Sequence, residues 1–143
     1  MSTPRGNGAR QLARKLALQA LYSWQVNPRA WQDLVGEFDL AEEAARTDRD
    51  FYVALVRGVC EHAAELDAQL ATWTDRPAAE LDPVEHAALL IGLTELRAHP
   101  EVPFRVAISE AVTLARRFGA TDGHKFVNAV MDKAARALRP QEH

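Results

Sequence analysis

Apolar residues recur with helical spacing near the amino end of the chain. At about 100° per residue, one continuous arc carries seven of them: Leu12, Ala13, Leu16, Ala17, Ala20, Leu21 and Trp24. The opposite arc carries polar side chains, with Leu18 as its only aliphatic residue. We predict an amphipathic helix from about residue 9 to residue 25. It ends before Asn27-Pro28, because the residue that precedes a proline avoids the α region.

The pattern predicts two further helices in the first half of the chain. A weaker one covers about residues 30–45, with a break near Gly36. A longer one begins at a cap at Thr47 or Asp48 and ends near Trp73. Its inward positions are apolar at helical spacing: Phe51, Leu55, Val59, Leu66 and Leu70.

The fourth predicted helix has the clearest start. Asp82 caps it, Pro83 takes the first helical position, and Glu85 reaches back as the partner of a capping box. The helix ends before Pro100. Its core side carries Val84, Ala88, Ile91 and Leu96, so that Glu85 points outward from the first turn as an exposed acid.

Two more helices are predicted after Pro103. The fifth covers residues 104–118, and Gly119 ends it as a left-handed residue. The sixth begins at Thr121 or Asp122 and runs to about Leu138. Its buried stripe consists of Val127, Val130, Met131, Ala134 and Leu138.

No segment alternates between apolar and polar residues for long enough to form a strand. We therefore predict an all-α protein, a compact bundle of about six or seven helices. Residues 1–8 are expected to be a disordered basic start, and residues 139–143 a short tail. Residues 9–138 are expected to form a single helical domain.

Composition narrows the class of protein further. The 143 residues are 48% apolar, which suits a globular domain with its own core. No apolar run approaches the ~20 residues that span a bilayer, and the amino end lacks the apolar stretch of a signal peptide. Cys60 is the only cysteine, which excludes an internal disulfide and a multi-cysteine zinc site. We expect a cytoplasmic protein with no membrane contact.

The charge is distributed unevenly along the chain, although its net value is only −3. Residues 1–32 carry five cations and no acid, and residues 33–85 carry fourteen acids and four cations. Residues 86–143 carry eight cations and six acids. If the two basic ends meet, they make a cationic patch that attracts a phosphate backbone. Charge runs of this size are otherwise ordinary solvated helix faces.

The sequence carries almost no sign of catalytic chemistry. The chain has no phosphate-binding glycine loop, no paired-histidine metal motif and no nucleophile elbow. The five histidines are scattered, and Cys60 lies in an apolar stretch that favours a buried thiol over a nucleophile. We predict a binding protein with no catalytic residues, no metal and no cofactor, rather than an enzyme.

Two aromatic residues lie beside cations at helix rims. Tyr22 falls on the polar arc with Lys15, and Phe126 lies near Lys125 and Lys133. Such rings can stack on unpaired bases. The alternatives are a tyrosine that lies over the helix rim and a phenylalanine that closes the end of the bundle.

The chain resembles the NusB family of bacterial transcription antitermination factors. The resemblance rests on short segments in one order along residues 9–138: Ala13-Arg14, residues 19–25, residues 55–58, Asp82-Pro83-Val84-Glu85, residues 94–96, Val102-Pro103, residues 106–112, Phe118-Gly119 and residues 124–128. It implies a helical bundle with two three-helix-like halves. It also implies binding of single-stranded boxA leader RNA together with NusE, a small-subunit ribosomal protein. With other Nus factors, this complex helps RNA polymerase read through ribosomal RNA operons.

The resemblance also implies where the partners bind. The RNA surface would consist of Arg10, Arg14, Lys15, Tyr22, Asp122, Lys125 and Phe126, and Glu85 would lie on the face that receives NusE. Two alternatives stay open. One is the helical domain of a ribosomal-RNA methyltransferase, for whose catalytic domain the chain has no room after its last helix. The other is a protein-only adaptor or homodimer that binds RNA weakly.

Overall fold

The structure, a computed structural model, describes residues 4–39 and 42–142. Within these residues it contains six α-helices and no β-strand, which confirms the all-α prediction. The helices are α1 (Asn7–Val26), α2 (Trp31–Phe38), α3 (Arg49–Leu70), α4 (Pro83–Ala98), α5 (Phe104–Phe118) and α6 (Gly123–Leu138). Three short 3-10 helices join them: η1 (Glu42–Arg46), η2 (Ala78–Glu80) and η3 (Pro140–Glu142).

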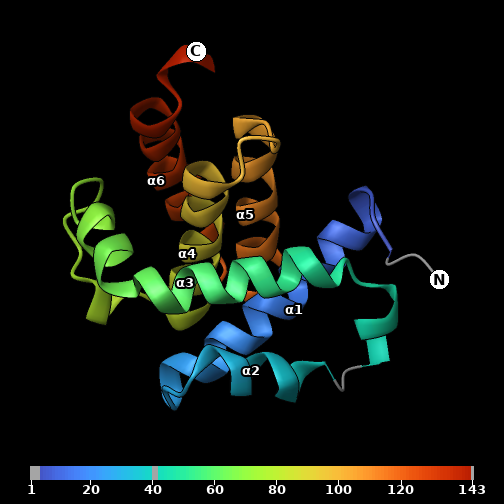
Figure 1. The fold of residues 1–143 in the computed structure, drawn as a ribbon. Coiled ribbons are helices and arrows are strands. Elements are labelled where there is room, and N and C mark those ends of the chain that lie inside the picture. Colours follow the sequence, from blue (N-terminus) through green and yellow to red (C-terminus); the bar gives the residue numbers. More distant parts are fainter. Residues whose placement is uncertain (1–3, 40–41, 143) are drawn as a thin grey trace. The chain divides into compact units, whose positions relative to one another are not determined.

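The chain divides into two compact units, residues 1–61 and residues 62–143. In the first unit, α1 packs against α2 and η1 (Figure 1). The predicted apolar arc of α1 is buried at Ala13, Leu16, Ala17, Ala20 and Leu21. Helix α1 begins at Asn7, two residues inside the start that was predicted to be disordered; residues 1–3 of that start lie outside the described residues.

The second predicted helix is shorter than its pattern indicated. Gly36 does not break it but lies inside α2, which ends at Phe38. A 3-10 helix then covers residues 42–46, where a continuation of the α-helix was predicted. The hydroxyl of Tyr52 on α3 donates to the Val35 carbonyl over 3.0 Å, which ties α2 to the core of this unit.

The predicted start of α3 is confirmed by its cap. The Asp48 carboxylate accepts from the Phe51 amide over 3.1 Å, and all five predicted inward positions are buried. The helix kinks at His62, whose φ of −125° and ψ of 18° are not helical. The boundary between the two units falls at this kink.

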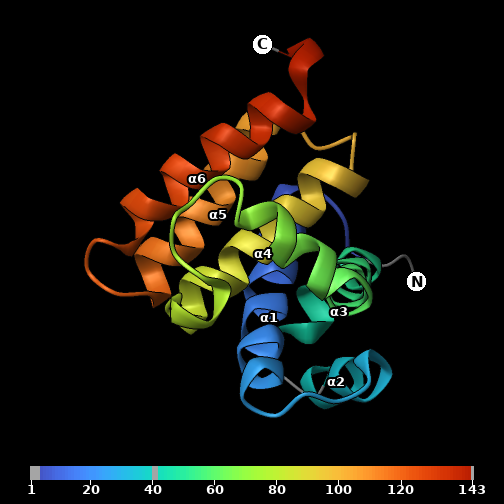
Figure 2. The same ribbon diagram turned by 90° about the vertical axis from the view of Figure 1, so that its left-hand side faces the viewer.

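The second unit contains α4, α5 and α6, which lie side by side in both ribbon views (Figures 1 and 2). Helix α4 is buried at every position from Ala87 to Leu96, because this stretch is apolar except at Thr94 and Glu95. A close approach fixes α6 against it. A side chain on Gly92 of α4 would begin 2.5 Å from the methyl carbon of Met131, so a larger residue there requires the Met131 side chain to move.

A buried arginine closes the end of α4. Arg139 directs its guanidinium at five acceptors: the carbonyls of Glu95, Leu96, His99 and Val102 and the carboxylate of Glu142. Three of these carbonyls belong to the last turn of α4 and its cap; those of Glu95 and His99 also accept the amides of His99 and Val102, so the guanidinium is a second donor to them. Arg139 was assigned to a tail by sequence, whereas the structure makes it part of the core of the second unit.

The end of α5 differs from its prediction. Gly119 has φ −98° and ψ −172°, which is extended rather than left-handed backbone. Glycine is required there for another reason. A β-carbon at this position would lie 2.7 Å from the carbonyl oxygen of Ala115 in the preceding turn.

Candidate nucleic-acid interface

The residues that the resemblance assigns to RNA divide between the two units. Arg10, Arg14, Lys15 and Tyr22 lie on α1 in the first unit. Asp122, Lys125 and Phe126 lie at the start of α6 in the second unit. Each unit therefore presents its own candidate surface.

The two arginines of α1 share one buried aromatic ring. The guanidinium carbon of Arg10 lies 4.1 Å from the centroid of Phe51, and that of Arg14 lies 5.1 Å from it. Phe51 is 3% exposed and Arg14 only 4% exposed. The prediction that Arg14 lies on an exposed surface is therefore wrong, because Phe51 at the start of α3 covers this part of the polar arc of α1.

Four of the five cations in residues 1–32 lie close to acids. Arg10 lies 3.6 Å from Asp48, Lys15 lies 2.9 Å from Glu43, and Arg29 lies 2.6 Å from Glu37. The Glu37 hydrogen bond raises the pKa of Arg29, and the same contact lowers the pKa of Glu37. Arg5 approaches Asp50 at 4.0 Å. The positive charge of residues 1–32 is therefore largely compensated within this unit.

Tyr22 is the predicted residue of α1 whose exposure fits its proposed role. Its side chain is 45% exposed on the polar arc of the helix. Leu18, on the same arc, is buried at 3% exposure. An exposed phenol on a rigid helix is a suitable platform for stacking on a base.

At the start of α6, Asp122 and Lys125 are exposed and form a 3.3 Å ion pair with each other. Phe126 is half-buried, and the guanidinium of Arg76 lies 4.5 Å from the centroid of its ring. Arg76 belongs to the loop between α3 and η2. The ring of Phe126 is therefore held between its own helix and this loop.

Phe126 also lines a groove of about 580 Å³. The lining comes from the loop that follows α3 and from one side of α6: Thr72, Trp73, Thr74, Asp75, Phe126, Ala129, Val130 and Lys133. We call it the Trp73–Phe126 groove. Sequence reasoning placed Trp73 at the end of a helix and did not connect it with Phe126. The position of Trp73 in a polar segment could have indicated a binding residue, because binding residues concentrate on such loops.

Glu85 differs from its prediction in two respects. The Asp82 cap is confirmed, since its carboxylate accepts from the amides of Val84 and Glu85 over 2.9 and 3.3 Å, but among the described residues the Glu85 side chain does not make the predicted capping-box hydrogen bond back to Asp82. The Glu85 side chain, however, is only 5% exposed and does not point into solvent. It packs on the first turn of α6 so closely that a β-carbon on Gly123 would overlap its carboxylate. Burial, and next the charge of Asp82, raise the pKa of Glu85, while Arg76 lowers it.

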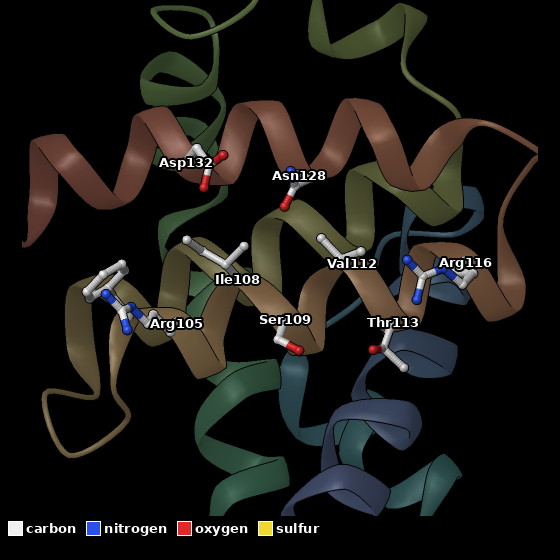
Figure 3. Close-up of a pocket in the computed structure, with 9 residues that line it drawn as sticks. Arg105, Ile108, Ser109, Val112, Thr113, Arg116, Asn128 and Asp132 are labelled. Atoms are coloured by element: carbon white, nitrogen blue, oxygen red, sulfur yellow. The ribbon is translucent and has the colours of Figure 1, made fainter.

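A second groove, of about 440 Å³, lies between α5 and α6 (Figure 3). Ile108 and Val112 lie on the side of α5 that faces α6, with Asn128 and Asp132 across from them. Arg105 and Arg116 lie toward its two ends (Figure 3). Its lining residues on α6 alternate with those of the Trp73–Phe126 groove, so the two grooves use different sides of that helix.

Other chemistry is not visible in the described part of the chain. Residues 4–39 and 42–142 hold no group of three or more histidine, cysteine, aspartate or glutamate side chains that suits a metal ion. Among the same residues, no helix combines the length and apolar character needed to cross a membrane. Burial raises the pKa of the Cys60 thiol to about 11, so it stays protonated at neutral pH and is a poor nucleophile.

The structure is that of an all-helical protein whose candidate contacts are an exposed tyrosine and a half-buried phenylalanine beside cations. The NusB family model matches residues 11–136. Transcription antitermination protein NusB of Idiomarina loihiensis is 46% identical over 92% of this chain and 95% of its own length. Its namesake from Hahella chejuensis is 48% identical over 93% of this chain and 89% of its own. The chain therefore belongs to the NusB family, whose members are transcription factors rather than enzymes.

Solved structures show the same fold. NusB of T. maritima matches with a TM-score of 0.85 at 24% identity, over 99% of this chain and 97% of its own. A NusB chain from a crystal structure of the antitermination factors NusB and NusE with double-stranded RNA matches with a TM-score of 0.72 at 23% identity. That match covers 92% of this chain and 99% of the other.

Proposed function

We propose that this protein is an RNA-binding transcription antitermination factor that binds boxA-type leader RNA together with NusE. In that role it joins the antitermination complex on RNA polymerase and favours read-through of ribosomal RNA operons. The observation that carries the proposal is the 46% identity, along almost the whole chain, to a protein named for transcription antitermination.

The described surfaces support an RNA ligand. Tyr22 is exposed on α1, and Phe126 lines an open groove beside cations on α6. Single-stranded RNA is recognised by stacking unpaired bases on such rings, worth ~1–3 kcal/mol for each base. Arg14 has a different place in this proposal: it is buried on Phe51 and supports α1 rather than touching RNA.

NusE is proposed as the protein partner because it accompanies NusB in a structural relative. The assignment of Glu85 to that interface stays a prediction. Because the side chain is buried, the role to be tested is an indirect one. A carboxylate packed on Gly123 acts on a partner by holding the start of α6, rather than by direct contact.

The proposal is tested by fluorescence anisotropy of a labelled boxA-like RNA, with and without NusE, at two salt concentrations. We expect binding that strengthens with NusE and weakens with salt, as phosphate contacts require. Tyr22→Ala and Phe126→Ala should each weaken binding, and Tyr22→Phe should retain it because the ring remains.

A protein-only adaptor is the second candidate, and the ion pairs of Arg10 and Lys15 favour it because they compete with phosphate. Binding of NusE without measurable RNA affinity, in a folded helical protein, would establish the adaptor and exclude the RNA-binding proposal. A homodimer in sedimentation that blocks RNA binding would favour it as well.

A further inference from the structure

We propose that the Trp73–Phe126 groove holds an unpaired nucleobase, with Trp73 and Phe126 as its aromatic walls and Lys133 and Arg76 as its phosphate ligands. This inference rests on the proposed function and adds three residues to the RNA site. Those residues are Trp73, Arg76 and Lys133, none of which belongs to the seven that the resemblance supplied.

The groove has the composition of a base-stacking site. Trp73 and Phe126 come from different elements, the loop after α3 and the first turns of α6, and both line one open volume of about 580 Å³. Ala129 and Val130 supply small apolar positions beside Phe126 on the same side of α6. Two rings and an apolar side accept the face of any base without reading its sequence.

The loop is ordered in a way that positions its arginine. The hydroxyl of Thr72 donates to the Gln69 carbonyl over 2.6 Å, which fixes the loop to the last turn of α3. The hydroxyl of Thr74 accepts from the Arg76 amide over 3.2 Å. Arg76 then stacks on the Phe126 ring, which leaves its cation beside the groove before any ligand arrives.

The cations here are available to a phosphate. Within residues 4–39 and 42–142, neither Arg76 nor Lys133 makes an ion pair with an acid. Both side chains belong to exposed residues. Lys133 lies seven residues after Phe126, two turns along α6 and about 10 Å away along the axis. A strand that stacks one base on Phe126 can therefore place a neighbouring phosphate at Lys133.

One lining residue opposes this ligand. Asp75 places a carboxylate in the groove, which repels a phosphate. The proposal therefore predicts opposite effects from two neighbouring positions. Removing the charge of Asp75 should strengthen RNA binding, and removing that of Lys133 should weaken it.

The test uses the full chain with a boxA-like RNA that carries 2-aminopurine at one position at a time, with NusE present. We expect one position to lose fluorescence on binding, because stacking on tryptophan quenches the base. Trp73→Ala should abolish that quench and weaken binding about ten-fold, within the range that stacking on one base provides. Lys133→Gln should weaken binding by a few-fold, and Asp75→Asn should strengthen it.

Matched controls come from the groove between α5 and α6. Arg116→Gln removes an exposed cation that has no ion pair among the described residues, and Phe104→Ala removes a lining ring. Both should leave RNA affinity and the quench unchanged. Circular dichroism and urea unfolding verify that each variant is folded. If Trp73→Ala does not fold, the exposed substitutions Lys133→Gln and Asp75→Asn still test the proposal.

The outcomes separate the two proposals. If the wild-type protein binds RNA while the Trp73, Lys133 and Asp75 variants match it, the groove proposal is overturned and the RNA-binding function stands. Equal losses in the control variants overturn the groove proposal in the same way. If the wild-type protein binds no RNA in the presence or absence of NusE, both proposals fail.

Discussion

The cations on α1 and those beside the Trp73–Phe126 groove differ in what surrounds them. On α1, Arg10 and Lys15 face acids and Arg14 lies buried against Phe51. Beside the groove, Lys133 makes no ion pair with an acid within the described residues, although Asp75 lines the same groove, and Arg76 stacks on a partly exposed ring. The first set stabilises its own unit, whereas the second set can release counterions to a phosphate.

The comparison explains the uneven charge of the sequence. Residues 33–85 are acidic, and Glu37, Glu43, Asp48 and Asp50 from this segment are the partners of the basic amino-terminal segment. A local excess of cations in a sequence is therefore a poor guide to a binding surface. A better guide is the charge of the side chains that make no ion pair in the folded protein.

We expect a buried and hydrogen-bonded cation to stabilise the fold in either unit. The largest effect should come from Arg139, which is buried in the second unit. Arg139→Met removes the donors for four carbonyls and the Glu142 carboxylate. We expect a loss of about 3 kcal/mol in unfolding free energy, because buried backbone carbonyls lose a charged donor. Urea unfolding measures it, and a loss below ~1 kcal/mol would show that water replaces the guanidinium.

The next largest effect compares one cation from each region. Arg14→Met should cost about 2 kcal/mol, because it removes a desolvated contact with a buried ring. Lys133→Met, on an exposed position of α6, should change stability by less than about 0.5 kcal/mol. Equal costs in urea unfolding would remove the distinction between structural and available cations.

For the salt dependence of RNA binding, we expect the cation beside the groove to matter more than a cation on α1. Lys133→Gln is expected to reduce the slope of log affinity against log salt by about 0.7, the value for one phosphate contact with a single strand. Lys15→Gln should reduce it less, because Glu43 already holds that ammonium group. Anisotropy titrations at four salt concentrations measure both slopes, and a larger change for Lys15→Gln would reverse the comparison.

The smallest expected effect concerns Glu85, a buried acid in the second unit. Its pKa is raised above the ordinary value of 4.5 by burial, so the folded protein holds this proton more tightly than the unfolded chain. The protonated Glu85 carboxyl contributes to the free energy of unfolding at low pH, and this contribution is lost as the pH rises through the pKa of the folded state. Glu85→Gln should therefore be more stable than the wild type at pH 8.

The difference for Glu85→Gln should shrink as the pH falls toward 4.5. Thermal unfolding of both proteins between pH 4.5 and pH 8 measures the trend. A gap that grows on acidification would mean that the ionised carboxylate stabilises the start of α6, in conflict with its burial.

The positions of the helices and most of their ends could be predicted from the amino-acid pattern. Apolar residues at helical spacing marked the buried positions of α1, α3 and α6, and the cap at Asp82 marked the start of α4. These features depend on residues near one another in the chain, so local patterns record them. The resemblance to NusB indicated the family. It also indicated candidate RNA-binding residues, which periodicity alone cannot distinguish from other polar residues.

The exposure of individual polar residues could not be predicted from the pattern, because it depends on packing between elements. Arg14 and Glu85 read as surface residues because each lies off the main apolar stripe of its helix, yet packing against Phe51 and Gly123 buries them. Trp73 and Phe126 lie 53 residues apart in the chain and line one groove. Helical periodicity describes one element at a time, whereas burial and pairing depend on what a second element places against it.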